Sequence, residues 1–177
     1  TVSNTLNLAE DLLYADSVIA VGSPTITVSR SWTSNGGLFI PDNSTVVLSA
    51  SAGTEDIETN GGAFYNLEID ASGVTYNLSV DQTITNDLII TNGTLDLNGY
   101  DLNIAGSLLN SGTLNVGTRT VTFNGTSGTH SIQTGGATIY NMVINSSTGL
   151  ATYELESNIS VSNNFTITDG SFDLSPD

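Results

Sequence analysis

Apolar and polar residues alternate along most of this chain, and turn-forming residues interrupt the alternation every few positions. Alternation places successive side chains on opposite faces of an extended strand, so it predicts β-strands with one buried face. The interruptions are Asn-Gly, Ser-Gly and Asp-Gly pairs, which favour turns. No segment repeats apolar residues at helical spacing over three turns, and the nearest, Leu6–Tyr14, matches a strand-like segment farther along. The pattern predicts an all-β protein.

The predicted inward positions come in pairs that lie two residues apart. Such short pairs fit the faces of a β-solenoid, whereas the strands of a β-sandwich are typically five or six residues long. The pairs in the second half of the chain are Leu95 and Leu97, Leu102 and Ile104, Leu114 and Val116, Val121 and Phe123, Met142 and Ile144, Tyr153 and Leu155, Ile159 and Val161, Phe165 and Ile167, and Phe172 and Leu174.

The chain also repeats its own sequence at a nearly constant interval. Residues 11–37 align without a gap on residues 87–113, an offset of 76. The match resumes at an offset of 75, where Tyr65 meets Tyr140, and it ends at an offset of 77. Repeats of this kind build elongated stacks and surfaces. We expect a partial repeat over 1–24, a first unit over 25–100 and a second unit over 101–177.

Two architectures satisfy the pattern. The first is a β-solenoid, a right-handed parallel β-helix in which turns of about 20 residues stack about 4.8 Å apart. The second is a pair of tandem β-sandwich domains with strand exchange between subunits, for which Thr1–Pro24 is the candidate donor segment. The short inward pairs and the drift of the offset at loops favour the solenoid, which would be one continuous domain.

The segment Tyr65–Thr126 carries a resemblance to a known group of proteins. It contains Tyr65-Asn66-Leu67, then Thr94-Leu95-Asp96-Leu97-Asn98-Gly99-Tyr100, and Tyr140–Leu174 repeats part of it. These strings resemble the repeats of bacterial and archaeal extracellular surface proteins of the adhesin-like or autotransporter-like kind. The resemblance implies a right-handed parallel β-helix and a secreted, elongated, non-catalytic stalk or adhesive rod at the cell surface.

Composition narrows the choice of partners. The 177 residues include 18 acidic side chains against two basic ones, Arg30 and Arg119, which gives a net charge of −16. A surface without clustered cations repels nucleic acid and anionic membranes, and it suits a salt- or calcium-rich exterior. No cysteine is present, so a disulfide framework is excluded. No apolar run approaches the ~20 residues of a membrane span.

Few residues suggest chemistry. Asp96, Asn98 and Asp101 place three oxygen-bearing side chains around one glycine turn, a set that could hold calcium or form an Asx-type β-turn. We expect no other cofactor. Cleavage of polysaccharides needs a carboxylate pair, or acids beside a basic residue, and neither arginine lies in an acidic cluster along the sequence. His130 stands alone. The sequence therefore predicts that the chain is not an enzyme.

Asparagines form two further groups. Asn66 and Asn141 each follow a tyrosine where the alternation breaks, so we expect them to form a structural ladder at a corner. Seven asparagines begin Asn-x-Ser/Thr sequences and are glycosylation candidates in a secreted protein: Asn43, Asn77, Asn92, Asn124, Asn145, Asn158 and Asn164.

The function expected from these observations is structural. Ser175-Pro176 matches Ser23-Pro24 at an offset of 152, twice 76, so the chain stops where another strand would begin. Both ends of a solenoid expose unpaired backbone. We therefore expect a segment or subunit of an extracellular surface fibre that assembles head to tail with copies of itself. The alternative is an adhesin stalk or a segment that binds surface glycans.

Overall fold

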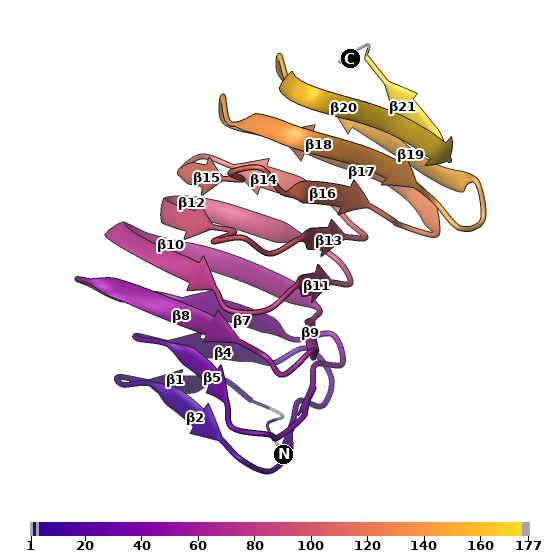
Figure 1. Ribbon diagram of the computed structural model, residues 1–177. Helices are drawn as coiled ribbons and strands as arrows, with labels where there is room; N and C mark the ends of the chain where they lie inside the picture. The colour runs from indigo at the N-terminus through magenta and orange to yellow at the C-terminus, as the bar shows by residue number, and fades with distance from the viewer. Residues whose placement is uncertain (1, 3, 175–177) are drawn as a thin grey trace.

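The computed structural model describes residues 2 and 4–174, which form one stack of parallel β-strands of about eight turns (Figure 1). The predicted β-solenoid is confirmed, and the tandem sandwich is not formed. The strands are β1 (Leu6–Leu8), β2 (Leu12–Tyr14), β3 (Val18–Ile19), β4 (Thr25–Val28), β5 (Trp32–Ser34), β6 (Phe39–Ile40), β7 (Thr45–Leu48), β8 (Thr54–Glu58), β9 (Ala63–Phe64), β10 (Asn66–Leu78), β11 (Gln82–Ile84), β12 (Leu88–Asp96), β13 (Leu102–Ile104), β14 (Leu108–Asn110), β15 (Thr113–Asn115), β16 (Thr120–Phe123), β17 (Ser127–Gln133), β18 (Thr138–Asn145), β19 (Leu150–Leu155), β20 (Ser160–Asp169) and β21 (Ser171–Asp173).

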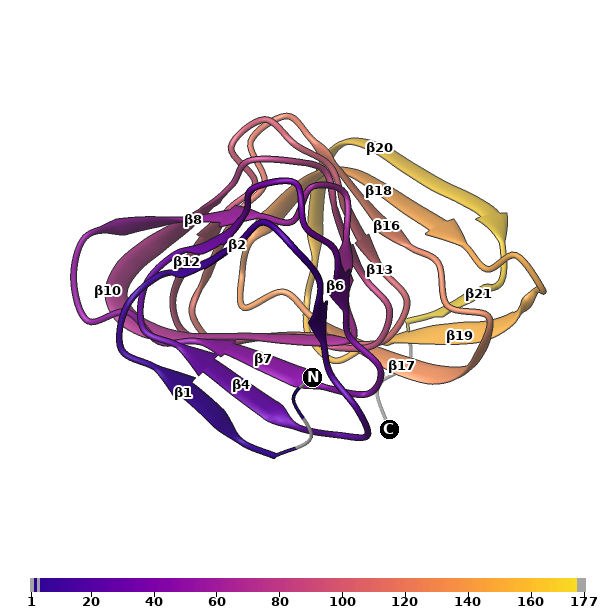
Figure 2. The ribbon, with the colours of Figure 1, turned by 90° about the horizontal axis from the view of Figure 1, so that it is seen from below.

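Each turn of the solenoid contributes three strand segments, which stack into three faces around a closed interior (Figure 2). The first face contains β1, β4, β7, β14 and the first parts of β10 and β12. The second contains β2, β5, β8, β15 and the later parts of β10 and β12. The third is a six-stranded sheet from β9 to β20, with β3 and β6 paired separately below it. Residues 4–24 lie in the first turn and pair within the chain, so this segment is not a free donor strand.

The core is a set of aliphatic ladders that run along the stack. On the first face, Ile26, Val46, Leu67, Leu88 and Leu108 are register partners in successive turns, and all are buried. The alternation predicted from the sequence places these side chains inward and their neighbours outward. Full burial of one such side chain stabilises the fold by about 1.5–3 kcal/mol. The ladders therefore hold the turns together.

The sequence repeat is a repeat of structure, but it is not a whole number of turns. The unit that begins at β4 contains eleven strand segments, because β10 and β12 each cross a corner and count twice. At three segments per turn, this is about three and two-thirds turns. The counterpart of β4 is β13, which belongs to a different sheet. Each copy of a strand therefore lies one face away from the original.

Two buried tyrosines, Tyr76 and Tyr153, connect corners of successive turns. The hydroxyl of Tyr76 accepts a hydrogen bond from the Ala50 amide at 3.1 Å and donates one to the Arg30 carbonyl at 3.2 Å. Tyr153, its counterpart in the second unit, makes the same two kinds of hydrogen bond. Its hydroxyl accepts from the Gly125 amide at 2.6 Å and donates to the Ala105 carbonyl at 2.9 Å. Each phenol therefore satisfies backbone groups at corners where no strand ladder does so.

Burial of the Tyr76 phenol makes the stability of the fold sensitive to alkaline pH. Desolvation raises the pKa of Tyr76 to about 12, whereas an unfolded tyrosine has a pKa of about 10. Between these values the unfolded chain loses the proton and the folded chain keeps it. The free energy of unfolding should therefore fall as pH rises from about 10 to about 12, by about 2–3 kcal/mol from this group.

We expect Tyr76→Phe to be less stable than wild type at neutral pH, by about 1–3 kcal/mol, because the Ala50 amide and Arg30 carbonyl lose their partner. Its stability should fall less steeply between pH 10 and 12. Urea titrations followed by circular dichroism at several pH values measure both effects. Parallel pH dependences in the two proteins would contradict the burial of a neutral phenol.

Candidate functional site

The turn predicted to hold calcium is closed by its own hydrogen bonds. One carboxylate oxygen of Asp96 accepts from the Asn98 amide at 2.7 Å, and the other accepts from the Asn115 side chain at 2.6 Å. The Asn98 side chain donates to the Leu78 carbonyl of the turn below at 3.1 Å, and Asn98 adopts a left-handed φ of 49°. This is the geometry of an Asx turn that also connects neighbouring turns.

Asp101 has different partners from the rest of that turn. Its carboxylate lies 3.0 Å from Nε of Arg119 and accepts from the Thr120 amide at 3.0 Å. Within residues 2 and 4–174, no group of three or more His, Cys, Asp or Glu residues could hold a metal ion. The calcium site stays a prediction, and the carboxylates of Asp96 and Asp101 already serve the corners of the solenoid.

The predicted asparagine ladder has partners that the sequence did not indicate. Oδ1 of Asn66 accepts from the Asn86 side chain at 2.8 Å and from the Asp87 amide at 3.2 Å, and its Nδ2 donates to Thr45 at 3.2 Å. Asn141 likewise accepts from Asn163 at 2.9 Å. Asn66 and Asn141 therefore do not stack on each other. Each pairs with an asparagine of the next turn. Asn163 is the counterpart of Asn86 in the second unit, so the sequence repeat could have indicated that Asn86 and Asn163 share a role.

The glycosylation candidates differ in accessibility. Asn77 and Asn124 are half-buried on strands or beside them, and Asn92 donates to the Asp70 carboxylate at 2.8 Å. The exposed candidates are Asn43, Asn92, Asn145, Asn158 and Asn164.

The structure corrects one inference about the arginines. Arg30 does lie in an acidic cluster, because its guanidinium is within 3.9 Å of Glu10, 3.4 Å of Asp11 and 3.8 Å of Glu55. These residues come from three successive turns, so no local sequence pattern joins them. Glu55 is buried and also accepts from the Ser31 hydroxyl at 2.7 Å. The ion pairs of Arg30 therefore connect three successive turns at this corner.

His130 occupies the position of Glu55 in the second unit. Its ring lies 5.3 Å from the ring of Tyr153, and its Nε2 is 3.0 Å from the Ser127 carbonyl. These contacts belong to the same corner that the Tyr153 hydroxyl closes, so His130 has a packing role there.

An outward array on the second face was missed by the sequence reading. Thr54, Thr75, Thr94 and Thr113 are register partners in four successive turns. Two residues farther along the same strands, Asp56, Asn77, Asp96 and Asn115 form a parallel row. Both rows occupy positions that alternate with the buried ladder, so the solvent side of this face is a regular lattice of hydroxyl, carboxylate and amide groups.

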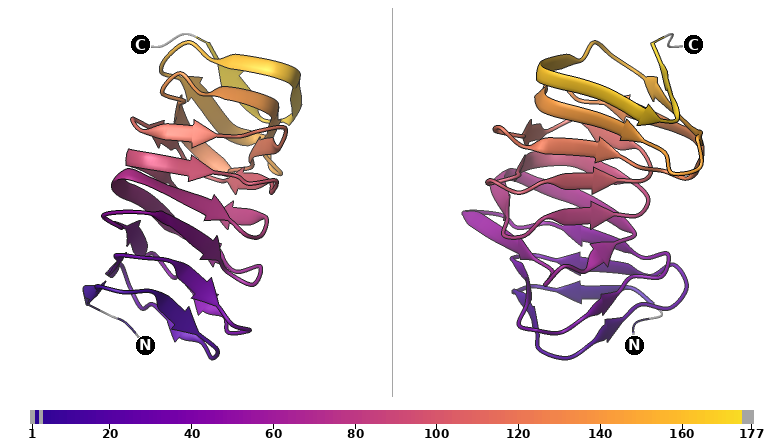
Figure 3. Two further views of the ribbon diagram at one scale, coloured as in Figure 1. Left: turned by 60° about the vertical axis from the view of Figure 1, so that its left-hand side comes forward. Right: turned by 45° about the vertical axis from the view of Figure 1, so that its right-hand side comes forward.

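The last described turn presents core side chains to solvent. Phe165 and Ile167 of β20 are register partners of the buried Met142 and Ile144, yet they are 44% and 50% exposed. Phe165 packs on Phe172 of β21, with ring centroids 5.0 Å apart. β20 and β21 form the outermost described turn of the stack (Figure 3). At the opposite end, Leu6, Leu8, Leu12 and Val18 are only partly buried.

The described residues contain no helix of the length and hydropathy needed to cross a membrane. No family model matches the chain, and neither a curated protein nor a solved structure matches it. The likeness to adhesin-like and autotransporter-like repeats therefore remains an expectation from the sequence.

The asparagine pairs should contribute unequally to stability. We expect Asn66→Ala to lower the free energy of unfolding by about 1–3 kcal/mol, because an amide of the next turn and the Asn86 side chain lose their acceptor. Asn141→Ala should cost less, because Asn141 meets the exposed last turn. Asn145→Ala, an exposed control, should change stability by less than about 0.5 kcal/mol. Chemical denaturation measures the free energy of unfolding of all three variants. Equal losses of stability in Asn66→Ala and Asn145→Ala would contradict a structural role for the asparagine ladder.

Proposed function

We propose that this chain is a non-catalytic structural segment of an extracellular surface fibre, and that copies of it stack head to tail. The observation that carries the proposal is the last described turn. Phe165 and Ile167 continue the inward ladders of the core, but no described turn lies above them to cover them. A second copy would bury these side chains against its own first turn, where Leu6, Leu8 and Leu12 are also incompletely covered.

The backbone supports the same partner. A parallel strand can bond to one neighbour on each edge, and among the described strands β20 pairs only with β18, on one edge. Such an edge is a template for another strand of the same kind. The contact joins one end of a copy to the opposite end of the next, so it is heterologous and extends into a filament when the rotation does not close.

The surface charge supports an extracellular setting. With no lysine and a net charge of −16, the chain offers nothing to a nucleic acid and is repelled by anionic lipid. Head-to-tail stacking keeps this charged surface on the outside of a fibre while it covers the apolar ends. An adhesin or glycan-binding segment is the second candidate function, and the cavity described below favours it.

The end-to-end contact predicts that charged substitutions at inward positions of β20 prevent assembly, whereas the same substitutions at outward positions do not. We expect the purified chain to form filaments in negative-stain electron microscopy and to sediment as a concentration-dependent series of oligomers. Phe165→Asp combined with Ile167→Asp should leave monomers, because two charges would be buried without partners at the contact. Asn164→Asp combined with Thr166→Asp adds the same charge to the same strand on the outward side and should assemble like wild type, or within a few-fold of it.

Circular dichroism and the unfolding midpoint show whether each double variant is folded. A monodisperse wild-type monomer over the whole concentration range would contradict the filament. Equal assembly of the two variants would contradict the contact through β20. Repeating the series with millimolar calcium tests whether cations contribute, since fibres that require calcium would place bridging carboxylates at the contact.

A further inference from the structure

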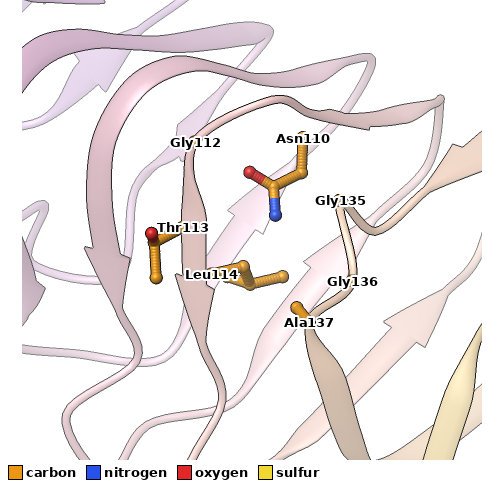
Figure 4. A pocket seen from close by; sticks show the side chains of 7 residues that line it. All are labelled: Asn110, Gly112, Thr113, Leu114, Gly135, Gly136 and Ala137. Atoms are coloured by element: carbon orange, nitrogen blue, oxygen red, sulfur yellow. The ribbon is translucent and has the colours of Figure 1, made fainter.

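A cavity of about 160 Å³ opens between two segments of the second unit (Figure 4). One wall is formed by Asn110, Thr113 and Leu114, and the other by Gly135, Gly136 and Ala137. Exposed Thr113, Gly135 and Gly136 lie at its entrance, and buried Leu114 lies within it. The cavity occurs where β15 has a ladder partner among the described strands on one edge only, in β12. A single water molecule needs a cavity of about 10–15 Å³, so this cavity has room for a larger ligand.

The cavity contains a polar group that the described part of the protein leaves without a partner. Asn110 is fully buried, and its Nδ2 donates to the Thr134 carbonyl at 2.6 Å, but its Oδ1 has no hydrogen-bond partner. In Figure 4 the Asn110 amide projects into the space between the two walls. Oγ1 of the adjacent Thr134 is also buried and unpaired. Leaving buried polar groups unsatisfied costs about 1–3 kcal/mol each, so a guest that donates hydrogen bonds would gain that energy.

The first unit has three packed aromatic rings at positions equivalent to this part of the second unit. There, Trp32 packs on Phe39 and Phe64 with ring centroids 4.8 and 5.2 Å apart. The counterparts of these aromatic residues in the second unit are the aliphatic Leu108, Leu114 and Ile139. Of these three, Leu114 lines the cavity, and its side chain is smaller than the Phe39 ring at the equivalent position.

The unpaired polar atoms also arise from divergence between the units. In the first unit, Oγ1 of Thr59 donates to Gln82 at 3.1 Å, and Gln82 in turn donates to the Gly62 carbonyl at 3.1 Å. Thr134 is the counterpart of Thr59, but the counterpart of Gln82 is Ile159. The second unit therefore has neither these aromatic rings nor the amide that pairs with the threonine.

From this comparison we propose that the cavity is a binding site for one sugar ring, either a free monosaccharide or the end of a glycan. The lining consists of Asn110, Thr113, Leu114, Ala137 and three glycines, none of which carries a charge, so the ligand is neutral. The free Oδ1 of Asn110 calls for a hydroxyl donor, and Leu114 and Ala137 suit the C–H face of a ring. The small volume limits the site to a single ring. This inference does not depend on head-to-tail assembly.

The test is a titration of the full chain, carrying nitrogen-15, with the methyl glycosides of glucose, galactose and mannose. We expect at least one of them to shift the Asn110 side-chain amide and the Gly135 and Gly136 amides saturably, with a dissociation constant in the millimolar range (~1–10 mM). Leu114→Phe, which restores the ring of the first unit, should weaken binding at least tenfold. An oligosaccharide that ends in the bound sugar distinguishes a glycan end from a free monosaccharide by its affinity.

A second variant protects the test against misfolding. Asn110→Ser installs the residue that Ser34 provides at the same place in the first unit, and it should also weaken binding. Asn115→Ser, on the exposed side of β15, should bind like wild type. No saturable shift with any of the three glycosides would overturn the proposal. Shifts of equal size with glycerol, or shifts unchanged by Leu114→Phe, would identify an adventitious additive only and would overturn it as well.

Discussion

The structure depends on one constraint, which is that each strand must match the turn below and the turn above at the same time. Val46 illustrates it, because its backbone pairs in register between Ile26 and Leu67 while its side chain completes their ladder. A slip of one residue would turn every inward side chain outward. Turns can therefore vary in length only at corners, and the step between register partners ranges from Leu95↔Leu114 to Trp32↔Ile57 without disturbing either ladder. Because backbone pairing and the apolar ladders fix the register, the stack forms regularly in a chain that has only two basic residues for ion pairs.

The same constraint explains which parts of the fold the sequence could predict. Alternation identified the inward positions, and Leu102, Val121 and Met142 are buried as expected. The self-match between the two units identified equivalent strands. It could not show that copies lie on different faces, because the number of segments in a turn is a property of the closed turn and not of the local sequence. The sequence therefore showed Asn66 and Asn141 as equivalent positions, whereas their partners, Asn86 and Asn163, come from the adjacent turns.

Sites assembled across turns were beyond the reach of the sequence for the same reason. Arg30 pairs with the adjacent Glu10 and Asp11 of the turn before it and with Glu55 of the turn after it, residues that are distant in sequence from Arg30 but within 3.9 Å of it at one corner. The threonine row from Thr54 to Thr113 is likewise visible only when the register is known. In contrast, the turn at Asp96 and Asn98 was recognised from local sequence, because an Asx turn is made by neighbours.

The comparison of the two units shows how a solenoid can change its interior without losing its shape. Replacing a ring by a smaller side chain in a compact core usually costs stability, part of which is recovered when the surroundings collapse. Here one wall of the space belongs to strands held by ladders to other turns, since β14 pairs with β12 and β17, and β15 pairs with β12. The other wall, formed by Gly135, Gly136 and Ala137, is a turn between β17 and β18. Leu114, which occupies the place of the larger Phe39, lines the cavity, so the two units keep the same strand pattern while their interiors differ.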